Sequence, residues 1–494
     1  MNRLLLLLVT VAGLGLLATS AAAQTPGIGA ASPRTFTLQD ALQYAVEHYP
    51  SVKAAIEEVN ASSADVRVAK AAALPRLDGV WQTNRATVNN VTGLLLPQSI
   101  VPGISGPPLP DGSAQSAWGT AAGAFFSWEP FDLGLRAADV RSAEAAVTRA
   151  RASEGLTRLE VQASVAGAFL AVVHAELAIT AAQADLDRRT VLARAARALA
   201  DNQLRPGADA SRADAELAAA RTRSILAHKD LVVAQASLGR FLGVPEGLAG
   251  ANAAALLTST APPAGPASEA PTSSEAPRSS ETPASSDASA SHPLLQVRQA
   301  AVTAARAHDE VLADTNRPRL FLQSALFARG SGATFNGTLE GGTSGLWFDR
   351  ANWAAGFQVV FPNLFEIPSL RARRAASAAT VRAEAARYDE AQLLVTSEQR
   401  AARAITDAAR AVAANTPVQL AAARESEARA SARYQAGLAS IVEVADAQSL
   451  LAQAEYQDAV ARVDIWRALV GEAAARGDLA PLRTLAASSA GGTR

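Results

Sequence analysis

The sequence of 494 residues predicts an α+β membrane protein that is built as an internal duplication. Three observations lead to this fold class. The chain starts with an export signal, one pattern of segments occurs twice, and each copy places two segments of alternating hydrophobicity between long alanine-rich helical segments.

Residues 1–23 have the three parts of a secretory signal peptide. Arg3 precedes an apolar run over residues 4–18, and three alanines end at Ala23, after which we expect cleavage. A transmembrane anchor is the alternative, but the run is short and the polar pair Thr19 and Ser20 ends it. We therefore predict an exported protein.

The composition excludes several classes of protein. The chain has no cysteine, which excludes a disulfide framework, a thiolate metal site and a lipid-anchoring cysteine. A net charge of −1 argues against a nucleic-acid partner. The five histidines lack metal-ligand spacing, and no phosphate loop or nucleophile elbow occurs. We expect no enzyme, no cofactor and no metal.

An internal repeat organises the chain. Pro50 and Pro75 in the first copy are spaced as Pro293 and Pro318 are in the second, and the second proline of each pair starts a Pro-Arg-Leu sequence. The first repeat covers residues 24–257 and the second covers residues 292–478. The Ala/Ser/Thr/Pro/Glu-rich residues 258–291 are expected to be a flexible insert, and residues 479–494 a disordered tail.

Each copy is expected to form a helix, two strands, a long helix and a helix that returns after a break. The first helix of the first copy starts at Thr37, with Asp40 at the third position of a capping box. The expected strands cover about residues 77–90 and 118–130 in the first copy and 320–330 and 353–362 in the second. The long helices cover about residues 135–201 and 370–433, and the return helices residues 209–243 and 440–475.

The strands are the only segments expected to meet a membrane. No segment after the signal is a run of 18 or more apolar residues, so a closed barrel is the remaining way to span. Four strands cannot close a membrane barrel, because the smallest known have about eight. Several chains must therefore share one barrel. The candidates for its aromatic girdles are Trp81, Trp118, Trp128, Trp347 and Trp353.

The first long helix carries two apolar series with heptad spacing. One series is Leu159, Ala163, Ala166, Leu170, Val173 and Leu177, and the other is Val161, Val165, Ala168, Val172, Ala175 and Ile179. They are offset by about 200° around a helix on the order of 100 Å long. Two seams favour a helix that packs between two neighbours in a ring, although a helix inside an ordinary bundle remains an alternative.

The whole mature chain resembles the TolC-family outer-membrane efflux proteins. The resemblance rests on the duplication, on the strand-to-helix junctions WEPFD (residues 128–132) and PNLFE (362–366), and on RYQAGLASIVEVADAQ (433–448). It implies that Pro130, Asp132, Pro362 and Glu366 lie at the junctions. It also implies a homotrimer with a 12-stranded outer-membrane barrel, four strands per chain, continued by a periplasmic helical barrel.

The resemblance also implies a function. Such a protein lies in the cell outer membrane, extends into the periplasm and contacts outer-membrane lipid. It is the exit duct of a tripartite efflux pump or type I secretion system, and its partners are a periplasmic adaptor and an inner-membrane transporter. A soluble periplasmic coiled-coil adaptor or scaffold is the alternative, which would explain the signal peptide and heptads but not the strands.

The break in the second long helix is the candidate functional site. Gly437 suits a turn of the chain, and Ser440 can cap the return helix with Glu443 at its third position. By resemblance, Glu443 and Asp446 match the acidic ring of the periplasmic entrance; the alternative is a cap and a solvated residue. The adaptor-docking residues implied by the resemblance are Tyr434, Ala436, Gly437 and Leu438, with Pro206, Gly207 and Ala208 at the first tip.

Two further residues lie near the breaks. Asp209 is a weaker candidate for the entrance charge. The family can carry a basic gating residue at the position of Ala439, so this sequence departs from the pattern there.

Overall fold

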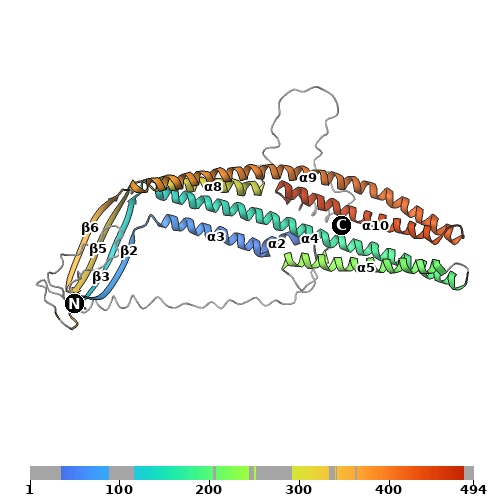
Figure 1. Cartoon of the computed structure of the whole chain (residues 1–494), viewed down its shortest axis with the longest axis horizontal. Coiled ribbons are helices and arrows are strands. Elements are labelled where there is room, and N and C mark those ends of the chain that lie inside the picture. Colours follow the sequence, from blue (N-terminus) through green and yellow to red (C-terminus); the bar gives the residue numbers. More distant parts are fainter. Residues whose placement is uncertain are drawn as a thin grey trace, which may run out of the picture.

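The computed structural model describes residues 35–87, 116–203, 207–243, 250–251, 292–332, 340, 342–361 and 364–482. The expected signal peptide and the 258–291 insert lie outside these residues. The chain is elongated, with a sheet at one end and helices that run away from it (Figure 1).

Four strands form one antiparallel sheet in the order β2-β3-β5-β6. They are β2 (Arg76–Thr87), β3 (Ser116–Phe131), β5 (Arg319–Ser331) and β6 (Arg350–Val360). All four fall where the sequence predicted strands, with ends that differ by a few residues. A second, two-stranded sheet pairs β1 (Thr35–Phe36) in parallel with β4 (Gly250–Ala251).

Large apolar side chains gather on one face of the four-stranded sheet. In the ladder between β5 and β6, Leu326 lies opposite Trp353 and Leu322 opposite Phe357. The exposed apolar residues of this face include Leu77, Trp81, Leu322, Leu326, Trp353 and Phe357. The predicted period-two alternation of Trp353 and Phe357 is therefore present, and the face is uncovered in the single chain.

The opposite face of the sheet is closely packed at one point. A Cβ atom on Gly123 would lie 2.4 Å from the Cβ of Phe327 on the neighbouring strand. Only glycine therefore fits at this position of β3. The neighbouring positions of this face include Asp78, Gln82, Gln323 and Arg350, so it is more polar than the apolar face.

The tryptophans considered for aromatic girdles differ in their surroundings. Trp81 and Trp353 are exposed on the apolar face, and Trp347 is exposed outside the strands. Trp128 instead donates its Nε1–H to the carbonyl of Ala73, 3.0 Å away. Its indole therefore ties β3 to the end of the preceding helix.

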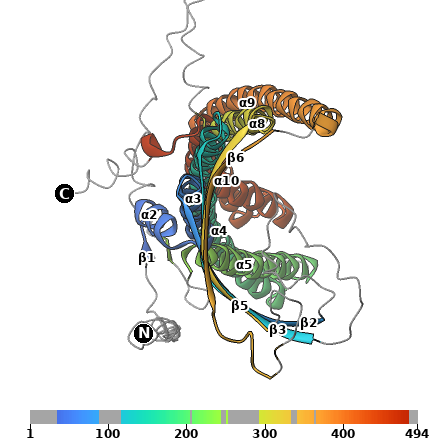
Figure 2. The same cartoon turned by 90° about the vertical axis from the view of Figure 1, so that its left-hand side faces the viewer.

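Each strand of the sheet adjoins one helix of a layer. The layer has the order α3 (Pro50–Ala71), α4 (Leu135–Asp201), α8 (Pro293–Asp314) and α9 (Ile367–Gln435), which repeats the order of the strands. Viewed from the sheet, the layer follows an arc, with α9 at one end (Figure 2). In the half farther from the sheet, α5 (Gly207–Leu242) and α10 (Ile441–Arg476) complete the layer, in the order α5-α4-α10-α9.

The main core lies near the middle of the molecule, where α2 (Leu38–His48) covers α4. Thr37 caps α2 as predicted, because its hydroxyl accepts from the backbone N–H of Asp40 at 3.2 Å. Members of both predicted seams of α4 are buried, including Val165, Leu170 and Val172. Helix α4 has neighbours of the same chain on both sides, which accounts for two seams.

One finding bears on the expectation that no helix spans a membrane, and one expectation about the tail needs correction. One described helix, α4, contains an 18-residue window that could cross a membrane by length and composition, although 44% of that window is buried inside the chain, as in a core helix. The tail does not become irregular at residue 479. Gly477 ends α10 with a φ of 83°, and the chain then returns so that Leu479 and Leu482 enter the main core.

Candidate functional site

The tip of the second hairpin, between α9 and α10, is closed by backbone hydrogen bonds. The N–H of Leu438 donates to the carbonyl of Arg433 at 2.8 Å, and that of Gly437 to Tyr434 at 3.0 Å. This is a Schellman turn, which requires a left-handed residue after the helix, and Gly437 has a φ of 75°. Ala436, Gly437 and Leu438 are exposed at this tip.

Glu443 and Ser440 form the predicted capping box at the start of α10. The Ser440 N–H donates to Oε1 of Glu443 at 3.2 Å, and the Glu443 N–H donates to Oγ of Ser440 at 3.4 Å. The other carboxylate oxygen of Glu443 is 3.8 Å from Nη1 of Arg433. Glu443 therefore stabilises the tip locally, and an entrance role would come in addition.

Asp446 lies one turn beyond Glu443, and both side chains are exposed. Residues three apart share a helix face, so the two carboxylates stand on the same side of α10. The structure thus brings together the two residues that were predicted to line an entrance. Their common face is open in the single chain.

The tip of the first hairpin, between α4 and α5, turns earlier than predicted. Helix α4 ends at Asp201, and Gln203 adopts the left-handed conformation with a φ of 60°. Gly207 is already the first residue of α5, with Ala208 exposed beside it and Asp209 in the same turn. Pro206 lies outside the described residues.

The two tips are packed together by a small apolar cluster. Tyr434 and Ile441 of the second hairpin belong to one cluster with alanines of the first, and Tyr434 is only 6% exposed. The members of this cluster are Ala193, Ala196, Ala213, Leu217, Tyr434, Ala439, Ile441 and Val444. Ala439 is buried in it, so its position does not present a gating side chain to solvent. Tyr434 likewise supports the tip from inside.

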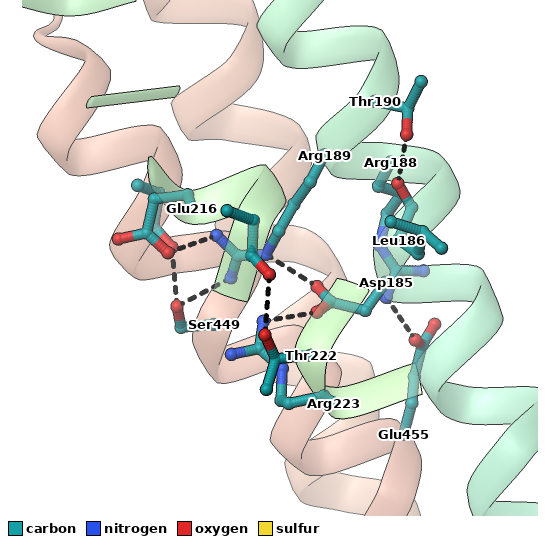
Figure 3. Close-up of polar contacts among 12 residues, drawn as sticks. Asp185, Leu186, Arg188, Arg189, Thr190, Glu216, Thr222, Arg223, Ser449 and Glu455 are labelled. Atoms are coloured by element: carbon teal, nitrogen blue, oxygen red, sulfur yellow. Dashed lines mark hydrogen bonds and ion pairs between the residues drawn. The ribbon is translucent and has the colours of Figure 1, made fainter. Parts of the chain in front are cut away.

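A network of charges centred on the buried Asp185 and Arg189 joins the two hairpins (Figure 3). Along α4 it lies between the residues of the main core and the tip. Arg189 of α4, which is 2% exposed, donates to Asp185 at 3.0 Å, to Glu216 of α5 at 2.8 Å and to Oγ of Ser449 of α10 at 2.9 Å. Arg223 of α5 donates to the second oxygen of Asp185 at 2.7 Å. One guanidinium therefore links three helices.

A second ion pair lies beside this network. Arg188 of α4 donates to Glu455 of α10 at 2.7 Å. Sequence reasoning missed both features, although a signal existed. The heptad series that ends at Ile179 reaches Arg189 when it is continued with the same spacing, so a charge falls on a seam position.

The first strand-to-helix junction is held by charged groups. Asp132 accepts from the backbone N–H groups of Gly134 at 3.1 Å and Arg136 at 2.6 Å, and from the Arg136 side chain at 2.9 Å. Burial raises the pKa of Asp132, but these hydrogen bonds outweigh it and hold the pKa below the usual value. Arg319 forms a bidentate ion pair with Glu129, donating to its two carboxylate oxygens at 2.7 and 3.0 Å. Pro130 lies between these two carboxylates in the sequence, near the end of β3.

The second junction lacks such a cap. Glu366 precedes α9 without a side-chain hydrogen bond to the helix, and Ser369 donates to its carbonyl at 2.9 Å. Pro362 lies outside the described residues. Among the predicted junction residues that the structure describes, Asp132 is thus the one whose side chain bonds the start of the helix.

Among the residues that the structure describes, no group of three or more His, Cys, Asp or Glu side chains could hold a metal ion. The candidate site therefore consists of the two tips, the exposed carboxylates of Glu443 and Asp446, and the charge network around Arg189.

The sequence matches the family described as "Outer membrane efflux protein" over residues 41–244 and 284–471. A search of curated proteins found no match.

Solved structures share the fold at low sequence identity. The CmeC outer membrane channel of Campylobacter jejuni has a TM-score of 0.69 at 15% identity, covering 89% of this chain and 85% of CmeC. The outer membrane protein VceC of Vibrio cholerae has a TM-score of 0.67 at 18% identity, covering 89% and 96%. The open state of the MtrE channel of Neisseria gonorrhoeae has a TM-score of 0.64 at 18% identity, covering 90% and 89%.

Proposed function

The chain belongs to the outer membrane efflux protein family, and from this premise we propose that three copies form an exit duct through the outer membrane. The duct would carry substrates from an inner-membrane transporter and a periplasmic adaptor across the periplasm and the outer membrane. The observation that carries this proposal is the sheet, which has one uncovered apolar face and two unpaired edge strands.

The sheet supports a barrel shared between copies. Within the described residues, β2 and β6 each pair with one strand, so each leaves a row of backbone N–H and C=O groups unpaired. Unpaired backbone groups are not tolerated in lipid, where only a closed barrel satisfies them. Three copies with four strands each give 12 strands, and their apolar faces would meet lipid.

The helices support a tube that continues the barrel. Their layer follows the order of the strands, so a closed barrel would place the layers of three copies around the same axis. The tips lie at the end of the molecule opposite the sheet (Figure 1). We propose that this end is the periplasmic entrance, and that the exposed Ala436, Gly437 and Leu438, with Pro206, Gly207 and Ala208, face the adaptor.

The exposed carboxylates support an acidic entrance. With three copies, Glu443 and Asp446 would place six carboxylates around one axis, and such rings favour cations in channels. Neither residue is needed for catalysis in this proposal, since the duct carries out no reaction and the energy comes from the transporter.

The test is single-channel conductance of the purified trimer in planar bilayers. The variant Glu443→Gln/Asp446→Asn removes both charges, while glutamine keeps the capping box. We expect a cation-selective pore whose selectivity falls in the variant. Ser440→Ala, which removes a cap but no charge, is the control and should keep the selectivity.

Three results would count against the proposal in different ways. A pore of unchanged selectivity in the variant would move the constriction away from Glu443 and Asp446. A monomer in detergent would remove the shared barrel. Release of the protein from membranes by carbonate washing would favour the soluble scaffold.

A further inference from the structure

Helices α3 and α9 are the two ends of the helical layer. Helix α3 packs against α4 and precedes the edge strand β2, and α9 packs against α8 and follows the edge strand β6. The two helices lie on opposite sides of the layer in both views (Figures 1 and 2). If β6 of one copy pairs with β2 of the next, α9 of the first copy comes beside α3 of the second.

The side of α3 that faces away from α4 is acidic. Val52 and Ala55 are buried against the rest of the chain, and the exposed series on the other side has heptad spacing. This series is Ala54, Glu58, Ala61, Asp65 and Val68. Glu58 and Asp65 form no ion pair within the described part of the chain.

The side of α9 that faces away from α8 is basic. Ser377, Ala391 and Val395 are buried toward α8. The opposite side presents exposed alanines at heptad spacing, namely Ala372, Ala376, Ala379 and Ala383, and Arg371 and Arg382 flank this series. Both guanidinium groups are exposed, and neither is in an ion pair with another described residue.

We propose that α9 of one copy packs against α3 of a second copy, with Arg382 paired to Glu58 and Arg371 paired to Asp65. The charges are complementary and stand at matching heights. Arg371 and Asp65 lie within about two turns of the sheet, and Arg382 and Glu58 lie about four turns from it. The alanines on both sides permit a close approach of about 8 Å between helix axes. This proposal rests on the shared barrel proposed above.

Disulfide cross-linking tests the contact directly, because the chain has no cysteine of its own. The pair Ala61→Cys and Ala379→Cys lies at one height on the two facing sides. Since α3 and α9 stand at opposite ends of the layer, a disulfide between these positions must join two copies. We expect dimers and trimers on a non-reducing gel, which collapse to monomers with reductant.

The matched control moves one cysteine to the other side of α9. The pair Ala61→Cys and Val381→Cys keeps the height but turns the second thiol toward α8, so it should not cross-link. Equal cross-linking of both pairs, or of neither in a protein shown to be trimeric, would overturn the proposed contact. If the wild-type chain is monomeric in detergent, the shared barrel itself fails.

Charge exchange tests the ion pair. Glu58→Arg and Arg382→Glu should each lower the temperature at which the trimer dissociates, and the double variant should recover most of the loss. Arg373→Glu, on the side of α9 nearer α8, is the control and should dissociate as the wild type does. Failure of the double variant to recover would overturn the pairing. An Arg382→Glu variant that keeps the trimer but loses bound anionic lipid would also overturn it, because Arg382 would then contact phosphate groups.

Discussion

Helices α4 and α9 have nearly the same length, 67 and 69 residues, and occupy equivalent places in the two repeats, but their surroundings differ. Helix α4 lies inside the layer, where α3 and α8 flank it near the sheet and α5 and α10 near the tips. Helix α9 lies at the edge. Seventeen residues of α4 are buried, against eight of α9. The helix inside the layer therefore buries more of its residues than the helix at the edge.

The charges of the two helices show the same difference. On α4, Arg136, Arg188 and Arg189 are all bound by carboxylates of this chain. On α9, Arg371 and Arg382 are exposed and form no ion pair with another described residue. Farther along α9, Arg387, Arg410 and Arg429 pair with carboxylates of the same helix. The arginines of α9 without a partner in this chain therefore include two near the sheet.

The largest difference is expected from arginine-to-methionine substitutions. Arg189→Met leaves the buried Asp185 without one of its two partners and Glu216 without its guanidinium, and removal of one partner of a buried pair costs about 3–5 kcal/mol. Arg403→Met on the exposed surface of α9 should change the free energy of unfolding by less than about 0.5 kcal/mol. Urea unfolding followed by circular dichroism measures both, and equal losses would contradict the contrast.

A smaller difference is expected at the two junctions. Asp132→Ala removes the cap of α4 and should cost about 1–2 kcal/mol, whereas Glu366→Ala removes no cap and should cost little. Because the folded pKa of Asp132 lies below its usual value of about 3.8, its contribution is complete above that pH and is lost as the pH falls through the folded pKa.

The measurement at this junction is thermal unfolding between pH 6 and pH 2, values chosen to bracket the aspartate range. The difference between wild type and Asp132→Ala should shrink toward acid pH. Asp132→Asn is the control that keeps a hydrogen-bond acceptor but cannot titrate. A difference that stays constant with pH would contradict the role of the carboxylate.

The smallest effect is expected at the starts of α3 and α8. His292 caps α8, since its Nδ1 accepts from the N–H of Leu294 at 3.1 Å and its Nε2 lies 3.3 Å from the carbonyl of Ala474. Burial lowers the pKa of His292, although the Ala474 carbonyl and the charge of Glu398 on α9 oppose this. Tyr49 caps α3 without a side-chain hydrogen bond.

Protonation of Nδ1 would remove the His292 cap. Because the folded pKa is lowered, stability is lost as the pH falls through the unfolded value of about 6.5 and stops falling below the folded pKa. His292→Asn keeps an acceptor at the cap, so the step in melting temperature between pH 8 and pH 5 should shrink. Burial also lowers the pKa of His174, which supplies the part of the step that remains. Tyr49→Asn should leave the step unchanged. A step of unchanged size in His292→Asn would assign it to another group.

The sequence was sufficient for features that depend on neighbours along the chain. The cap at Thr37, the capping box at Ser440, the turn at Gly437 and the alternation of Trp353 and Phe357 all follow from residues a few positions apart, and the structure shows each of them. At Thr37 the reciprocal bond of the expected capping box is absent, since the Asp40 side chain bonds the Thr37 hydroxyl instead. The long helices also have bounds within a few residues of those predicted.

The sequence was insufficient where three helices meet. Asp185 and Arg189 are four apart, as in many solvent-exposed pairs, and only the packing of α5 and α10 makes this pair buried. The first tip was placed at Gly207 because glycine suits a turn, but Gln203 adopts the left-handed conformation instead. At the tail, the many small and polar residues after Gly477 led to a prediction of disorder, although Leu479 and Leu482 pack in the main core.

The shorter helices of the layer end and begin near its middle, whereas α4 and α9 run past this level without a break (Figure 1). Each join between shorter helices, such as the contact of Gly477 with His292, therefore lies beside a continuous helix. Among the described elements, α4 and α9 are the helices that connect the tips to the sheet without a break, so a twisting force applied to the tips reaches the sheet through them. The torsional stiffness of the helical layer at mid-length is thus set by two helices per chain.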